Sequence, residues 1–143
     1  MELNLVASGI ELIGTTVKSL KIDNNIVDVE RNGKRSFGLN INEPKFQKTE
    51  GTLFAQMLIE FEIEVHQFEE QKCKINLALE GVFMAKGAVK DEAFKELVIV
   101  NGAAALIGIA RGKIEMISAS IFNNGKIVIP FVNVIEYYKS LEE

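Results

Sequence analysis

Two neighbouring stretches of alternating apolar and polar residues constrain the fold of this chain more than any other feature of its sequence. In residues 52–65, apolar side chains alternate with three glutamates near the end of the stretch. After a short turn, residues 72–83 alternate in the same way. A period of two is typical of antiparallel strands with one buried face. Pairing Glu64 with Lys74 brings the two apolar faces together, so we expect a hairpin in that register.

The residues before this hairpin predict two further strands. Residues 5–22 mix β-branched and apolar side chains and lack helix caps, which predicts a long first strand that is bent or bulged near Gly14. Residues 36–41 alternate again and predict a second strand. Between them, residues 23–34 contain turn signals and an Asn-Gly pair, typical of either a small hairpin arm or a loop. Residues 42–51 are polar, with a proline and a glycine, and predict a loop.

Residues 101–122 are the one long helical candidate, and a short helical segment, residues 91–100, precedes them. Small residues at Ala104, Gly108 and Gly112 recur every fourth position and therefore share one helix face. Either this bare face packs against a second subunit, or it lets the helix lie close to its own sheet. A separate apolar row is expected to face the core: Ala103, Ile107, Ala110, Ile114, Ile117 and Ile121.

The C-terminal part completes an α+β fold. Asn123 to Gly125 carry the asparagine and glycine that commonly end a helix. Residues 126–131 read as extended, and Asn133 with Glu136 forms a capping box for a last helix through Leu141. Strands first and helices afterwards predict one domain over residues 1–143, with a four-stranded antiparallel sheet and its helices on one face.

The composition argues against several classes of partner. The net charge of −4, from 20 acidic and 16 basic residues, disfavours nucleic acid, which selects basic surfaces. A single cysteine, Cys73, permits no internal disulfide and suits a reducing cytoplasm. The N-terminus lacks the pattern of a signal peptide. The longest apolar run, residues 102–110, is shorter than the ~20 residues of a membrane span. We therefore expect a cytoplasmic protein without membrane insertion.

The residue types needed for catalysis are sparse. The lone histidine, His66, and Cys73 are too few for a zinc site, and the expected register places them on opposite faces of the sheet. No glycine-rich phosphate loop opens a helix. Glu60, Glu62 and Glu64 lie on the exposed side of a strand, where carboxylates keep ordinary pKa values. We expect no catalytic residue, metal or cofactor, and hence no enzyme.

Three segments, taken in order, resemble the pattern of one known protein family. Glu80-Gly81-Val82-Phe83 stands where that family closes a strand with Gly-Gly-Ile-Phe. Ala110-Arg111 stands where the family has Ala-Arg in its long helix. Ile127 to Asn133 resembles the family's Leu-Asn-Leu-Ala-Pro-Val-Asn-Phe, with the proline one place early. On these motifs the chain resembles the SecB export chaperone and its SecB-like relatives, over roughly residues 52–140.

The resemblance implies an ATP-independent chaperone that holds unfolded or extended polypeptides in apolar grooves. It also implies a homotetramer, a dimer of dimers with the long helix in the contact, which agrees with a bare face at Ala104, Gly108 and Gly112. The resemblance implies a role in protein export, with the SecA motor as partner; SecB-like relatives also serve as chaperones for antitoxins, or have no known role. From their size and placement we predict the following client-binding residues: Phe37, Phe46, Phe122, Phe131 and Tyr137.

The chain also departs from the export members of that family. Lys74 and Asn76 stand where those members carry a leucine and an acid that meet SecA. Gly108 and Ile109 replace an aromatic residue and a proline, and the acidic tail shrinks to Glu142-Glu143. These differences argue against the export role more than against a SecB-like fold. One alternative to a general chaperone is an oligomeric adaptor for one folded partner or a toxin–antitoxin pair, or a chaperone dedicated to an antitoxin. The other is a small-molecule-binding or enzymatic protein, in which an enclosed pocket replaces the groove.

Overall fold

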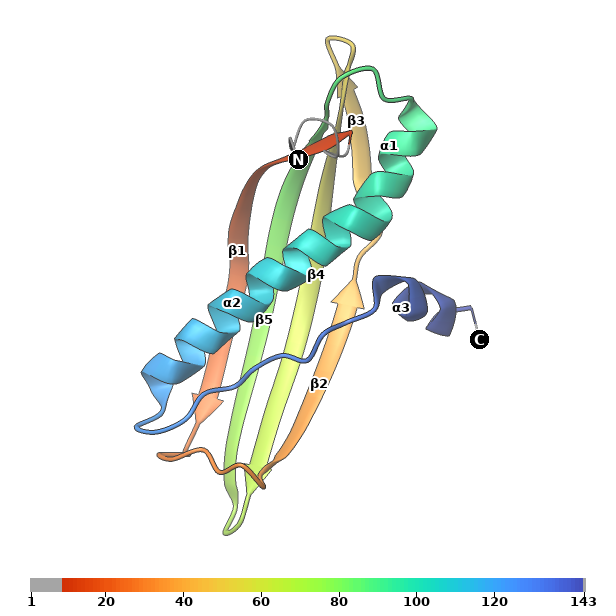
Figure 1. Ribbon diagram of the computed structural model, residues 1–143. Coiled ribbons are helices and arrows are strands. Elements are labelled where there is room, and N and C mark those ends of the chain that lie inside the picture. The colour runs from red at the N-terminus through yellow and green to blue at the C-terminus, as the bar shows by residue number, and fades with distance from the viewer. Residues whose placement is uncertain (1–8, 143) are drawn as a thin grey trace, which may run out of the picture.

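The computed structural model describes residues 9–142 and contains one antiparallel sheet (Figure 1). The hydrogen-bonded order is β1-β5-β4-β2, and β3 pairs with the other end of β4. The edge opposite β1 is therefore made by two short strands in succession, and the predicted α+β sheet is confirmed. The strands are β1 (Ile10–Asn24), β2 (Lys34–Ile41), β3 (Lys45–Thr49), β4 (Thr52–Gln67) and β5 (Gln71–Ala85).

The central hairpin of β4 and β5 has the register that the alternation predicts. Ile63 lies opposite Ile75, and Glu64 lies opposite Lys74. The apolar rows of both strands are buried under the helices, with Ile63 and Ile75 fully covered. The glutamates face the other side of the sheet, which none of the described helices covers (Figure 1).

The first strand is irregular, as predicted. The pairing of β1 with β5 shifts between Leu12 and Gly14, and again between Val17 and Ser19. After β1, the chain crosses from one edge of the sheet to β2 at the other, through the loop of residues 25–33. Of the two structures predicted for this segment, the loop is therefore the one observed. The part of the predicted first strand before Gly9 lies outside the described residues.

The prediction of a loop over residues 42–51 is wrong, because five of these residues form β3. Glu50 and Gly51 both adopt positive φ angles, 52° and 81°, and make a tight turn into β4. Such a turn suits the twist of two antiparallel strands. Phe46 lies opposite Ala55 on the helix-covered side and is half-buried. Because residues 42–51 are mostly polar, their sequence does not indicate the short edge strand β3, in which only Phe46 contacts the core.

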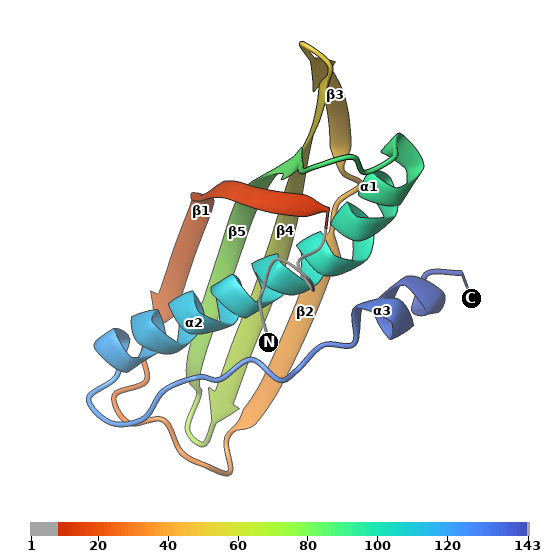
Figure 2. The same cartoon turned by 45° about the horizontal axis from the view of Figure 1, so that its top comes forward.

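One continuous helix crosses the sheet obliquely and covers one face (Figures 1 and 2). It consists of α1 (Asp91–Leu97), a π-helical segment (Val98–Gly102) and α2 (Ala103–Ile121). The predicted core row holds for its first four residues, whereas Ile117 and Ile121 are only half-buried. Leu106, absent from the predicted row, is fully buried against Gly81, where a side chain would collide with it.

By length and composition alone, the helix Asp91–Ile121 is apolar enough to cross a membrane, with a mean hydropathy of 1.6. This helix is longer than the apolar run of residues 102–110. The core helix of a globular protein has the same properties, and Phe94, Leu106 and Ile114 of this helix are fully buried against the sheet.

The C-terminal segment runs back beside α2. Residues 126–132 are extended and lie on the same face of the sheet as the helix (Figure 2). We call them the strap. Ile127 and Ile129 of the strap are fully buried, so it completes the helix-side layer of the core. The strap leads to α3 (Val134–Ser140), whose first turn is capped by Asn133: its side-chain oxygen accepts a hydrogen bond of 3.1 Å from the amide of Glu136.

Candidate functional site

The outward face of α2 carries the small residues that the sequence singled out. Ala104, Gly108 and Gly112 are all exposed. A Cβ atom added at Gly108 or Gly112 would meet no atom within 4 Å. These residues therefore do not serve the packing of the helix on its own sheet, which was one of the two interpretations of the pattern.

This outward face bears no charge along its centre. The exposed, uncharged residues of α2 form what we call the ridge: Ala104, Ala105, Gly108, Gly112, Met116, Ala119 and Ser120. Met116 is 69% exposed. Each glycine costs about 1 kcal/mol relative to alanine in a helix interior. Two glycines on an open ridge would destabilise the helix without benefit unless another surface comes close to its backbone.

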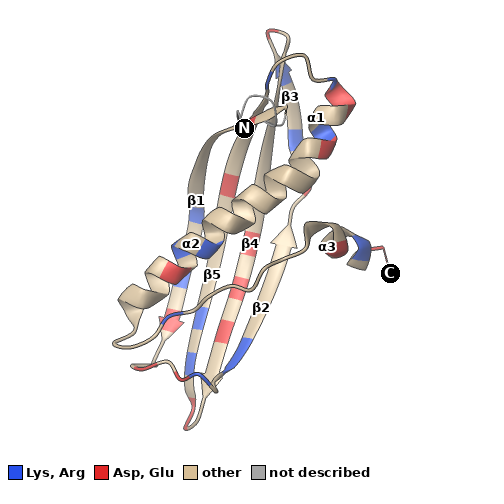
Figure 3. Cartoon of the chain, viewed as in Figure 1, with Lys and Arg blue, Asp and Glu red and all other residues tan. Residues whose placement is uncertain are grey.

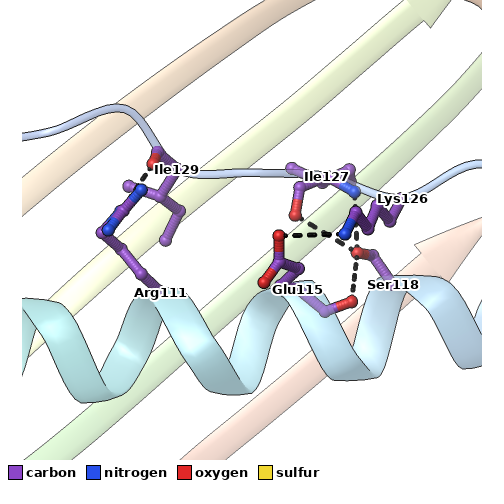
Figure 4. Close-up of polar contacts among 6 residues, drawn as sticks. All are labelled: Arg111, Glu115, Ser118, Lys126, Ile127 and Ile129. Carbon is purple, nitrogen blue, oxygen red and sulfur yellow. Dashed lines mark hydrogen bonds and ion pairs between the residues drawn. The ribbon is translucent and has the colours of Figure 1, made fainter.

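An exposed aromatic residue lies beside the ridge. Phe131 of the strap is 89% exposed. The guanidinium of Arg111 lies over its ring, 4.1 Å from the ring centre. The same guanidinium donates a hydrogen bond of 2.8 Å to the carbonyl of Ile129 (Figure 4). Arg111 thus ties the strap to α2 and holds Phe131 at the surface.

Two further contacts fix the strap to the helix (Figure 4). The hydroxyl of Ser118 is buried and accepts a hydrogen bond of 2.7 Å from the amide of Ile127. An ion pair joins Lys126 to Glu115 at 3.2 Å, with both side chains largely exposed. The buried contact orders the strap more strongly than the exposed pair, because exposed ion pairs contribute little.

The five predicted client-binding residues do not gather at one place. Phe131 is on the exposed outer surface, and Tyr137 of α3 packs beside Tyr138 at the end of β2. Phe37 lies on β2 opposite Ile63 and is half-buried. The other two lie toward opposite ends of the long helix. Phe46 lies beside α1, with its ring centre 6.2 Å from that of Phe94, and Phe122 lies in the core after α2.

Tyr137 makes a contact that the sequence did not signal. Its hydroxyl accepts a hydrogen bond of 2.9 Å from the amide of Ile41, the last residue of β2. The aromatic pair on α3 indicates that the helix must dock, but it does not indicate where. Burial, and secondarily the neighbouring Tyr137, raise the pKa of Tyr138.

Cys73 and His66 lie in different environments. Cys73 faces the helix layer and is buried, and this burial, with a smaller effect of Asp23, raises its pKa to about 11. His66 is exposed, and its ring nitrogen lies 3.5 Å from the carboxylate of Glu64. Residues 9–142 contain no group of three or more histidine, cysteine, aspartate or glutamate side chains placed to hold a metal ion.

At the edge of the sheet formed by β2 and β3, basic and acidic residues lie on different strands (Figure 3). β2 and β3 together contain four basic residues and no acidic one. Their neighbour β4 contains three glutamates and neither lysine nor arginine. A shallow depression of about 320 Å³ lies where β3 meets β4, lined in part by Phe46, Phe54 and Val82.

Comparisons with known proteins show a likeness of fold. No family model matches the sequence, and no curated protein matches it. A SecB-like chaperone from Mycobacterium tuberculosis, solved in complex with a ChAD peptide from the HigA1 antitoxin, superposes with a TM-score of 0.57 and 8% identity. The match covers 91% of this chain and 94% of that one. A protein of unknown function from Streptococcus agalactiae gives a TM-score of 0.50 and 10% identity, over 87% and 99% of the two chains.

Proposed function

We propose that this protein is an ATP-independent chaperone that holds unfolded or extended polypeptides. The observation that carries the proposal is Phe131 of the strap, an aromatic residue that is 89% exposed and held outward by Arg111. Other large apolar residues are exposed on α2, on the strap, on α3 and directly after α3: Met116, Val128, Ile135 and Leu141. Apolar surface of this kind marks interaction sites.

The binding mechanism needs no chemical step. Burying apolar client surface contributes about 25 cal/mol per Å², and this gain must exceed the entropy lost when the client segment is ordered. A folded protein has already buried its apolar side chains, so the chaperone should select unfolded chains. The likeness of fold to a chaperone solved with a bound peptide supports this reading.

We also propose that the ridge forms contacts between copies of the chain, in a homotetramer built as a dimer of dimers. The support is the bare helix face at Ala104, Gly108 and Gly112, where nothing else in the described chain approaches. Gly108 and Gly112 would allow two helix backbones to come close, as small residues do at helix contacts. The proposed setting is the cytoplasm.

A second candidate is a chaperone dedicated to one partner, such as an antitoxin. It is favoured by the solved neighbour, which holds an antitoxin peptide. Lys74 and Asn76 stand where export members carry a leucine and an acid that meet SecA, so this chain lacks both residue types at those positions. A role in export with SecA is therefore the weaker of the two specialised proposals.

Light scattering behind size exclusion, first alone and then with a reduced, unfolded test protein, tests the proposal. We expect a tetramer that binds the unfolded protein and ignores its folded form. A tetramer that binds neither would favour a dedicated partner. A monomer that binds neither would contradict both the general chaperone and the role of the ridge.

A further inference from the structure

Met116 is the most exposed of the methionines that the structure describes. It lies on the ridge and is 69% exposed. Met57 on β4 is 1% exposed, and Met84 on β5 is half-buried. Met1 lies outside the described residues. Small oxidants in solution therefore reach the thioether of Met116 more readily than those of Met57 and Met84.

Met116 is also the only large side chain on the ridge, whose other members are alanines, glycines and a serine. It stands four residues after Gly112 and eight after Gly108, so the three lie along one helix face. A Cβ atom added at either glycine would meet no atom within 4 Å. Where two ridges meet, the long and flexible side chain of Met116 can fill the space that the glycines leave.

The thiol of the chain is poorly placed to react with an oxidant. Cys73 is the only cysteine, it is 1% exposed, and burial raises its pKa to about 11. Peroxides react with the thiolate, which is scarce at neutral pH when the pKa is so high. A thioether has no acidic proton to lose, so its oxidation depends on access. Among the described sulfur atoms, that of Met116 is the one an oxidant meets first.

We propose that Met116 is an oxidation site, at which hydrogen peroxide converts the thioether to a sulfoxide and thereby blocks contact between copies at the ridge. A sulfur lone pair attacks one peroxide oxygen and the O–O bond breaks. The hydroxide that leaves takes the proton of the transferred oxygen and becomes water. The sulfur loses two electrons, and the peroxide gains them. The effect on assembly rests on the proposed function of the ridge.

The sulfoxide would place a strong hydrogen-bond acceptor on a surface with few donors. Alanine and glycine side chains offer none, and the hydroxyl of Ser120 already donates to the carbonyl of Met116 at 3.0 Å. Burying an acceptor without a donor is unfavourable, so oxidation should weaken each ridge contact by at least about tenfold. Assembled copies would shield Met116. Peroxide therefore acts on free chains and keeps them from assembling.

Peptide mapping by mass spectrometry, during treatment of the full chain with hydrogen peroxide, tests the site. Met116 should gain one oxygen atom before Met84 and well before Met57. Its oxidation should become slower as the protein concentration rises and the chains assemble, whereas that of Met84 should not. Earlier oxidation of Met57, Met84 or Cys73 would overturn the inference.

Light scattering behind size exclusion, before and after the same treatment, tests the consequence for assembly. The original protein should change from a tetramer to a smaller species. Met116→Leu keeps an apolar side chain of similar size but has no sulfur, so it should stay assembled. Met84→Leu is the matched control and should dissociate as the original protein does. Reduction of the sulfoxide by a methionine sulfoxide reductase should restore the tetramer.

Two other outcomes separate this inference from the proposed function. A tetramer that survives complete oxidation of Met116 would overturn the inference and leave the proposed assembly standing. A monomer before any oxidation would contradict the role proposed for the ridge, and the inference with it.

Discussion

The hydroxyl of Tyr137 accepts a hydrogen bond from the amide of Ile41, 96 residues earlier in the chain, at 2.9 Å. This bond anchors α3, a helix of 7 residues, to the end of β2. So short a helix is marginal in isolation, and its position depends on such contacts.

Replacing Tyr137 with phenylalanine should destabilise the protein by about 1 kcal/mol, because the partly buried Ile41 amide loses its acceptor. The measurement is urea unfolding followed by circular dichroism. Tyr138→Phe is the matched control, since no hydrogen bond within residues 9–142 uses its hydroxyl, and should change stability much less. Equal effects of the two variants would mean that the bond does not hold the helix.

Ser118→Ala should cost about 1–3 kcal/mol, because the buried amide of Ile127 would be left without an acceptor. Ser120→Ala on the same helix removes only an exposed hydroxyl bonded to the carbonyl of Met116, and should change stability by less than about 0.5 kcal/mol. Hydrogen exchange at Ile127 should rise in the first variant alone. Unchanged protection there would show that the strap is held by its apolar side chains instead.

Alanine at two glycines should have opposite effects on the free energy of unfolding. At Gly81 the new Cβ would stand 2.5 Å from a methyl carbon of the fully buried Leu106, which predicts a loss of about 1–3 kcal/mol. At Gly108 it would meet nothing, so the folded monomer should gain up to about 1 kcal/mol from better helix propensity. Thermal unfolding of both variants, with the oligomeric state monitored, checks this. In the proposed tetramer the same Cβ would stand between two close backbones, so Gly108→Ala should also weaken assembly. An unchanged oligomer would contradict the role proposed for the ridge.

Stability should fall between pH 9 and pH 11 through Cys73. Its pKa is raised from 9.0 to about 11 in the fold, so above pH 9 the unfolded chain releases a proton that the folded chain retains. Raising the pH therefore favours unfolding. Because lysines and tyrosines also titrate in this range, the measurement is the difference between the original protein and Cys73→Ala. An identical pH dependence of the two would show that the thiol does not contribute.

Phe131→Ser should weaken capture of an unfolded client with little effect on stability, since the ring is 89% exposed. Phe68→Ser is the control: Phe68 is 62% exposed but lies in the turn between β4 and β5, away from the strap. Titration of a labelled, unfolded protein measures both. If the two variants lose affinity equally, general surface hydrophobicity rather than the site around Phe131 explains binding.

Local patterns were enough to predict the core of the fold. The alternation around Ile63 and Ile75 determined the central hairpin and its register, because a one-residue slip would have buried the glutamates. The asparagine at position 133 marked the start of α3 correctly. The strand β3 was missed because an edge strand needs few apolar residues, and only Phe46 contacts the core.

The site was harder to predict, since it depends on contacts between distant segments. Periodicity identified the small face of α2 but could not tell exposure from burial at Gly108 and Gly112. Nothing in the sequence indicated that Arg111 would reach the strap or that Tyr137 would meet Ile41. Leu106 was missed because it lies one position from the expected row, over the glycine at position 81.

The crossing of the chain from one sheet edge to the other has a consequence for synthesis on the ribosome. β1 is made before the other described strands, yet its only neighbour among them is β5, which ends at Ala85. The nascent chain must therefore carry β1, with the backbone groups that later pair with β5 unpaired, until the central hairpin has emerged. Pairings that wait for distant partners are slow and prone to aggregation. We expect the newly made N-terminal half of this protein to depend on protection by other proteins before its own sheet can close.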